Sequence, residues 1–138
     1  MVNPTVLVDT NVLIAAMLGS HTARKVLHAI LNTPCSWLTS PKLIDELSNV
    51  PLRPKFQGII TSNQVRDMLD QLRRHAKLIH PKTSVQVCRD PRDNHVLAAA
   101  IDGHATYLIS GDRDLLTLSP FRGLAVVTPA EFLSQLED

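Results

Sequence analysis

Short, continuously apolar runs alternate along this chain with longer segments in which apolar residues recur at spacings of three and four. The runs have the length and β-branched content of strands that are buried on both faces. They cover residues 5–8, 35–38, 106–109 and 124–127, while 78–79 and 85–87 are ambiguous. The periodic segments predict helices over residues 12–17, 23–30, 41–50, 62–76, 93–102 and 129–136. This alternation indicates an α/β fold of three layers, in which helices flank a central, mostly parallel sheet.

At 138 residues the chain has the length of one domain, and we expect a single domain over residues 1–138. Hydrophobic residues make up 44% and charged residues 20%, which is the balance of a folded, water-soluble protein. No uninterrupted apolar run reaches the ~18 residues of a membrane span, so we expect neither membrane anchor nor signal peptide. Cys35 and Cys88 have no metal-ligand spacing. We expect two reduced thiols in a cytoplasmic protein, with a disulfide as the alternative.

Acidic residues occupy the points where two of the predicted strands stop. Asp9 follows the first strand, and Asp112 and Asp114 follow a later one. In open parallel sheets the ligand crevice lies beyond the carboxyl ends of the strands. Glu46 and Asp93 lie on or at the start of helices where the periodicity predicts apolar neighbours. Unpaired carboxylates in such places are costly, and one shared cation would compensate several of them at once.

The donor chemistry of these five acids favours a magnesium or manganese ion. Carboxylates are hard oxygen ligands, and none of the six histidines stands at a spacing typical of zinc sites. Once the five acids are set aside, 14 basic residues face eight acidic ones, so an acidic pocket would lie on a basic body. Mg²⁺ or Mn²⁺ activates bound water and neutralises charge on a phosphodiester. The pattern therefore indicates a polyanionic substrate.

Each acid also has a purely structural interpretation. Asp9 and Asp93 could cap the helices that follow them, Glu46 could pair with an arginine, and the last acid of the set could be exposed. Asp9 could also be the nucleophile of a phosphatase, but a second acid is expected two residues later, where Asn11 stands. The chain has no Walker loop and no GxGxxG motif. Capping alone does not explain why strand ends and an apolar helix face all carry acids, so we favour the metal pocket.

Four motifs, in their order along the chain, resemble those of the PIN domain. They are VLVDTNVLIAAML, the helical ELSNV, DPRDNHVLAAAI and YLISGDRDLL, and the closing TPAEFL extends the likeness over nearly the whole chain. The chain is similar in particular to the branch that contains the VapC-like toxins of bacterial toxin-antitoxin pairs. The resemblance implies a three-layer PIN-like fold and a Mg²⁺- or Mn²⁺-dependent endoribonuclease that cuts single-stranded RNA. It also implies two protein partners, a small antitoxin and a second copy in a homodimer.

The acidic positions of the family fall one by one on residues of this chain. The DTN motif places a carboxylate at Asp9, the helical glutamate is Glu46, and the acid that opens the next helix is Asp93. The last motif places a carboxylate at Asp112. Asp90 is the nearest competitor of Asp93, but it precedes a proline outside the helix. We therefore prefer Asp93.

The resemblance and the chemistry together assign a role to each candidate residue. We expect Asp9, Asp93 and Asp112 to hold the metal, directly or through water, and Glu46 and Asp114 to complete the catalytic set. Side chains expected to hydrogen-bond these carboxylates are Thr10, Asn11 and Ser110. Candidate RNA contacts are Arg53, Lys55, Arg92 and Arg113. The leading hypothesis is an endoribonuclease toxin, and the alternative is a catalytically weak PIN-like module that binds RNA or a protein partner.

Overall fold

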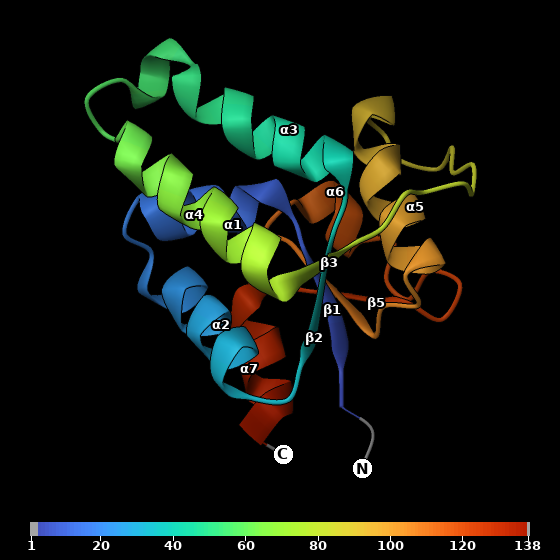
Figure 1. Cartoon of the computed structure of the whole chain (residues 1–138). Coiled ribbons are helices and arrows are strands. Elements are labelled where there is room, and N and C mark those ends of the chain that lie inside the picture. The colour runs from blue at the N-terminus through green and yellow to red at the C-terminus, as the bar shows by residue number, and fades with distance from the viewer. Residues whose placement is uncertain (1–2, 138) are drawn as a thin grey trace.

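A five-stranded sheet forms the centre of the structure, a computed structural model that describes residues 3–137. All neighbouring strands are parallel, in the order β3-β2-β1-β4-β5 (Figure 1). The strands are β1 (Thr5–Val8), β2 (Ser36–Thr39), β3 (Ala76–Leu78), β4 (Tyr107–Ile109) and β5 (Ala125–Val127). The predicted α/β architecture is confirmed, and the sheet is entirely parallel.

Helices connect the strands and cover both faces of the sheet. In the described part of the chain they are α1 (Thr10–Met17), α2 (His21–Asn32), α3 (Pro41–Asn49), α4 (Ser62–His75), α5 (Asn94–Asp102), α6 (Arg113–Leu116) and α7 (Pro129–Glu137). Short 3-10 turns are η1 (Val50–Leu52), η2 (Pro54–Phe56) and η3 (Pro91–Asp93). None of these helices combines the length and the hydropathy needed to cross a membrane.

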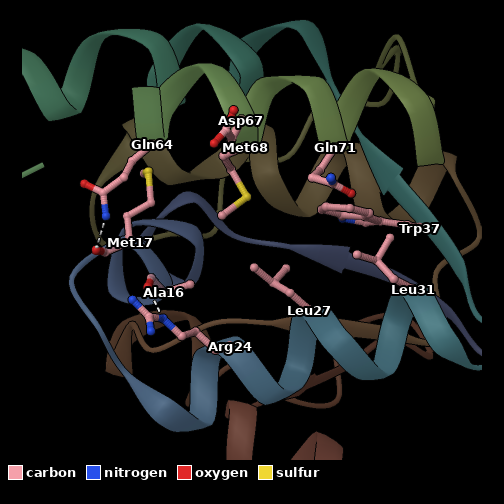
Figure 2. Close-up of a pocket in the computed structure, with 10 residues that line it drawn as sticks. All are labelled: Ala16, Met17, Arg24, Leu27, Leu31, Trp37, Gln64, Asp67, Met68 and Gln71. Atoms are coloured by element: carbon pink, nitrogen blue, oxygen red, sulfur yellow. Dashed lines mark hydrogen bonds between the residues drawn. The ribbon is translucent and has the colours of Figure 1, made fainter. Parts of the chain in front are cut away.

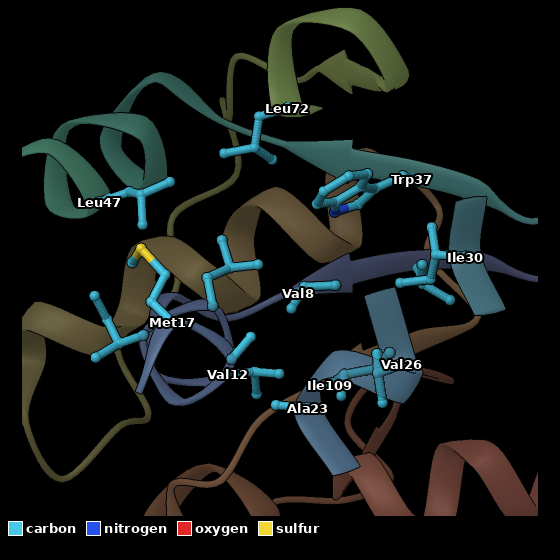
Figure 3. Close-up of a cluster of buried hydrophobic side chains, with 14 of the residues drawn as sticks. Val8, Val12, Met17, Ala23, Val26, Ile30, Trp37, Leu47, Leu72 and Ile109 are labelled. Carbon is cyan, nitrogen blue, oxygen red and sulfur yellow. The ribbon is translucent and has the colours of Figure 1, made fainter. Parts of the chain in front are cut away.

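Each face of the sheet carries its own buried core. Alternate strand residues point to opposite faces, so Val6, Val8 and Ile109 pack on one side with residues of α1, α2 and α7 (Figure 3). On the other side Leu7 and Leu108 pack with residues of α5 and α6. Because the strands are buried on both faces, their sequences are continuously apolar instead of alternating with polar residues.

The ambiguous segment 85–87 forms no strand. Val85 is buried in the core beside α5, but the chain just before it is held by a side chain. The Asp102 carboxylate accepts the backbone N–H groups of Lys82 and Thr83, at 2.5 and 2.9 Å. These donors are therefore not available to a neighbouring strand, and the chain crosses this region in irregular conformation.

The strand order reverses at β1. From β1 the chain runs outward to β2 and β3, and then returns to β4 on the other side of β1. The crevice beyond the carboxyl ends of β1 and β4 is the place where open parallel sheets bind ligands. Helix α3 lies above this edge (Figure 1). Its Leu43 packs in one core and its Leu47 in the other, so the intervening Glu46 lies close to the crevice.

Candidate active site

Asp9 is the centre of a hydrogen-bonded junction between β1 and β4. Its backbone N–H donates to the Ile109 carbonyl at 2.9 Å. The hydroxyl of Ser110 donates to Asp9 Oδ2 at 2.9 Å, and the backbone N–H of Thr10 donates to Oδ1 at 2.8 Å. Asp9 is only 8% exposed. It caps α1 with one oxygen and presents the other to Ser110, so the capping role does not exclude a role in the site.

Two of the three predicted supporting residues hold the Asp9 carboxylate through their side chains. The Asn11 amide donates to Asp9 Oδ2 at 3.2 Å and to Ser110 Oγ at 3.3 Å. Ser110 Oγ in turn accepts the backbone N–H of Asp112 at 3.0 Å. The Thr10 hydroxyl differs, because it is buried and has no hydrogen-bond partner among the described residues. Thr10 therefore supports Asp9 through its backbone alone.

A cavity of about 430 Å³ opens at this edge of the sheet, and we call it the acidic cavity. Its acidic lining residues are Asp9, Glu46, Asp90, Asp93 and Asp112. Its basic lining residues are Arg53, Lys55 and Arg92, and its largest apolar ones are Ile14, Leu18, Val50 and Phe56. Asp114 and Arg113, on α6, are exposed and lie outside this lining. Four of the five predicted acids and three of the four predicted cations therefore meet in one hollow.

The structure separates the two neighbouring candidates Asp90 and Asp93. Asp90 caps the η3 turn and pairs with Arg92 at 2.8 Å. Hydrogen bonds from Arg92 hold the pKa of Asp90 below its ordinary value. Asp93 precedes α5, but its side chain makes no capping hydrogen bond. The capping interpretation therefore fails for Asp93, and Asp93 is the acid of the two without a cationic partner among the described residues.

Burial and like charge raise the pKa of two acids of the cavity. Burial raises the pKa of Asp9 to about 6, against the opposing hydrogen bonds from Ser110 and Thr10, and the charges of Glu46 and Asp93 add to the rise. The pKa of Asp93 is also raised, first by burial and then by its acidic neighbours. Titratable groups shifted by burial and by specific neighbours inside a cavity are characteristic of functional sites.

The acids fit a divalent cation in chemistry but do not form a ready-made cage. Within residues 3–137 no three His, Cys, Asp or Glu side chains are grouped closely enough to enclose a metal ion. Mg²⁺ retains several waters and commonly takes only one or two carboxylates from the protein. A cation would also relieve the repulsion that raises the pKa of Asp9 and of Asp93. Asp9, Asp93 and Asp112 are thus suitable donors for a partly hydrated ion.

His95 is a residue that the sequence analysis missed. It lies in the first turn of α5, and its Nε2 is 2.9 Å from Glu46 Oε1. The sequence alternative for Glu46 was pairing with an arginine, but in the described chain the side chain that meets its carboxylate is this histidine. In the sequence, the one feature that pointed to His95 was its position two residues after Asp93. That position does not predict a contact with Glu46 until the placement of α3 and α5 is known.

A second hollow, of about 340 Å³, lies between α2 and α4 (Figure 2). We call it the apolar groove, and its apolar lining residues are Ala16, Met17, Leu27, Leu31, Trp37 and Met68. Two of its polar side chains are bound to the backbone of α1. Arg24 Nε donates to the Ala16 carbonyl and Gln64 Nε2 to the Met17 carbonyl, both at 3.0 Å. The groove contains none of the acids predicted to form the site.

Comparison with known proteins places the chain in a family. The model of the PIN domain matches residues 5–114. The uncharacterized protein MJ1680 of Methanocaldococcus jannaschii is 30% identical over an aligned length of 142 residues. The alignment covers 96% of this chain and 91% of that protein. The crystal structure of PAE2754 from Pyrobaculum aerophilum has the same fold, with a TM-score of 0.62 and 19% identity over 97% of this chain and 90% of that one. The chain therefore belongs to the PIN-domain family, whose members are generally nucleases.

Proposed function

We propose that this protein is a Mg²⁺- or Mn²⁺-dependent endoribonuclease that cuts single-stranded RNA in the acidic cavity. The observation that carries the proposal is Asp9, a buried carboxylate held by Ser110 at the point where the strand order reverses. Family membership supports phosphodiester hydrolysis, and the resemblance of the motifs supports RNA and the divalent ion. The cations Arg53 and Lys55 in the lining support a polyanionic substrate.

The residues of the cavity divide into three roles. Asp9, Asp93 and Asp112 would hold the metal ion, which supplies Lewis acidity and an activated water when bound. Glu46 faces the same cavity and would orient the attacking water and accept its proton. Arg53 would bind a phosphate of the strand. In the reaction, oxygen of the water bonds to phosphorus, the bond to the leaving ribose oxygen breaks, and that oxygen takes up a proton.

Cleavage of a labelled single-stranded RNA by the purified chain tests the proposal. We expect cutting with Mn²⁺ and none with EDTA, and little cutting of duplex RNA or single-stranded DNA. Asp9→Asn should lower the rate by about 100-fold or more, because it removes a carboxylate that binds the cation. Asp45→Asn is the matched control, since Asp45 adjoins Glu46 on α3 but is exposed and outside the cavity lining.

Two outcomes contradict the nuclease proposal. A wild type that remains inert with Mn²⁺ excludes it, and so does an Asp9→Asn variant that cuts as fast as the wild type. Binding of RNA by an inert wild type, measured by fluorescence anisotropy, would instead support the alternative of a catalytically weak RNA-binding module.

We propose further that the nuclease is the toxin of a VapC-like pair, that a small antitoxin silences it, and that it forms a homodimer. The support is the resemblance of the motifs to that branch. Induced expression in cells should arrest growth, and the Asp9→Asn variant should not. Light scattering should give the mass of two chains. Unimpaired growth with a wild type that cuts RNA in the test tube would exclude the toxin role.

A further inference from the structure

We propose that His95 is a positioning residue that holds the carboxylate of Glu46 in the acidic cavity, a role that rests on the proposed function. The two residues come from helices on different sides of the site. Glu46 is on α3, which lies above the carboxyl ends of the strands. His95 is in the first turn of α5, which packs in the core shared with Leu7 and Leu108. Their side chains meet with Nε2 2.9 Å from Oε1.

The side chain of His95 is more buried than that of Glu46. The side chain of His95 is 13% exposed, whereas that of Glu46 is 37% exposed. A glutamate side chain has many rotamers and loses much conformational entropy when it is ordered. The buried imidazole therefore restricts the Glu46 carboxylate to the side of α3 that faces the cavity.

No arginine or lysine in residues 3–137 performs this task. Arg53 and Lys55 line the same cavity, but neither forms an ion pair with Glu46, and the imidazole of His95 is the group that meets its carboxylate. Removal of the imidazole would consequently leave Glu46 with no group to restrain it on that side.

The contact leaves Glu46 able to work on another group. Oε1, the oxygen beside His95, is buried and accepts no hydrogen bond, whereas the Glu46 side chain as a whole is 37% exposed and lines the acidic cavity. His95 thus fixes the place of the carboxylate and leaves its exposed part free for the attacking water. His95 does not itself line the cavity, so it reaches the substrate only through Glu46. This distinguishes it from a catalytic residue and from a metal ligand.

Three variants separate positioning from simple packing. His95→Leu keeps a side chain of similar bulk without a donor, and His95→Gln carries an amide N–H that can reach Glu46. His21→Leu is the control, since His21 is an exposed histidine at the start of α2. Thermal melting followed by circular dichroism verifies that each variant is folded before rates are compared.

The rate of RNA cleavage and the affinity for Mn²⁺ are the two measurements. We expect His95→Leu to lower kcat by about 10- to 100-fold with KM little changed, which is the usual effect of losing a group that orients an active-site ligand. His95→Gln should recover most of that loss. Mn²⁺ titration, followed by the electron paramagnetic resonance of the free ion, should show weaker binding in His95→Leu than in His21→Leu, because the water that Glu46 would orient is one that the bound ion carries.

A double-mutant cycle identifies Glu46 as the residue through which His95 acts. In a Glu46→Gln background, His95→Leu should lower kcat by no more than about 2-fold, because the two changes remove one interaction. An undiminished loss in that background overturns the proposal, and so does a His95→Leu variant that matches the wild type in both kcat and Mn²⁺ affinity. A His95→Gln variant as slow as His95→Leu also overturns it.

The outcomes also separate this inference from the proposed function. A wild type that does not cut RNA contradicts the nuclease proposal. The comparison of Mn²⁺ affinity between His95→Leu and His21→Leu then tests the role of His95, and weaker binding in His95→Leu supports it. A wild type that neither cuts RNA nor binds Mn²⁺ overturns both.

Discussion

The acidic cavity and the apolar groove are similar in size and opposite in chemistry. Helix α1 lines both: Thr10 and Asn11 belong to the cavity, and Ala16 and Met17 belong to the groove. In the groove, Arg24 is hydrogen-bonded to backbone and the remaining walls are mostly apolar. In the cavity, acids crowd together and two of them have raised pKa values. Volume alone would not distinguish the two hollows, whereas the electrostatic state of their side chains does.

The largest expected effect is a loss of RNA cleavage on mutation of Asp93, and it should distinguish this acid from Asp90 in the same cavity. Asp93→Asn should lower kcat/KM for RNA cleavage by about 1,000-fold, or about 4 kcal/mol of transition-state stabilisation, because Asp93 is a proposed metal donor. Asp90→Asn should lower it by no more than about 5-fold, since the charge of Asp90 is already paired with Arg92. The measurement is steady-state kinetics with Mn²⁺. A larger loss in Asp90→Asn would reverse the assignment of the two residues.

The second largest expected effect is a pH dependence of protein stability that comes from Asp9 in the acidic cavity. We expect no such contribution from the apolar groove. Asp9 has a pKa of about 6 in the folded protein against 3.8 for an ordinary aspartate, so the folded state holds the proton more tightly. Its contribution to stability is complete below about pH 4 and is lost as the pH rises past 6. The loss is up to about 3 kcal/mol in metal-free protein.

Urea unfolding between pH 4 and 8, with EDTA present, measures this effect. Asp9→Asn should flatten the curve relative to the wild type, whereas Asp67→Asn, on the wall of the apolar groove, should leave its shape unchanged. Added Mn²⁺ should stabilise the wild type at pH 8 and not Asp9→Asn. An identical pH profile for the wild type and Asp9→Asn would contradict the raised pKa of Asp9.

Mutations in the apolar groove should lower the stability of the protein and leave the rate of RNA cleavage unchanged. Met17 is 7% exposed and packs in the core behind the groove (Figure 3). Met17→Ala should lower the free energy of unfolding by about 2 kcal/mol, at the low end for a buried methionine because the adjoining groove lets the site relax. The cleavage rate per folded molecule should be unchanged. A large loss of rate in a fully folded Met17→Ala would show that the two hollows are coupled.

Ser110→Ala should change the pH profile of stability less than Asp9→Asn does, because the carboxylate remains. It removes a hydroxyl that donates to Asp9 and accepts from Asn11 and from the backbone N–H of Asp112, and the hydrogen bond to the charged carboxylate alone is worth about 1.5 to 3 kcal/mol. Because the Ser110 hydrogen bond lowers the pKa of Asp9, its loss should move the midpoint of the pH profile of stability to higher pH. Ser48→Ala, which removes a hydroxyl bound only to the helix backbone, serves as the control. A midpoint unchanged in Ser110→Ala would show that the hydroxyl does not stabilise the ionised carboxylate.

Most of the fold could be predicted from the sequence because its signals are local. The continuous apolar runs correspond to β1, β2, β4 and β5, and the periodicity of residues 129–136 predicted α7, which starts with reciprocal hydrogen bonds between Thr128 and Glu131. The segment 85–87 could not be assigned, and the structure shows that the chain just before it, at Lys82 and Thr83, is held by the Asp102 carboxylate, far along the chain. The supporting positions of Asn11 and Ser110 followed from the motifs that resemble those of the PIN domain.

The parts of the site that escaped prediction depend on how distant elements meet. Glu46 and His95 approach only because α3 passes above the sheet, and no periodicity within either helix indicates that contact. Asp114 shows the converse case, a residue close to Asp112 in sequence that the fold places outside the cavity lining. Its spacing from Asp112 suggested a shared pocket, but α6 begins at Arg113 and leaves Asp114 exposed, with its backbone N–H bound to Asp112 Oδ1 at 2.9 Å.

A single side-by-side assay tests most directly whether the acidic cavity is where RNA is cut. The cleavage rate of one single-stranded RNA is measured with Mn²⁺ for wild type, Asp9→Asn and Met17→Ala, each corrected for its folded fraction. The wild type and Met17→Ala should cut at equal rates, and Asp9→Asn should be slower by about 100-fold or more. Equal rates for the wild type and Asp9→Asn, with a loss confined to Met17→Ala, would contradict that assignment.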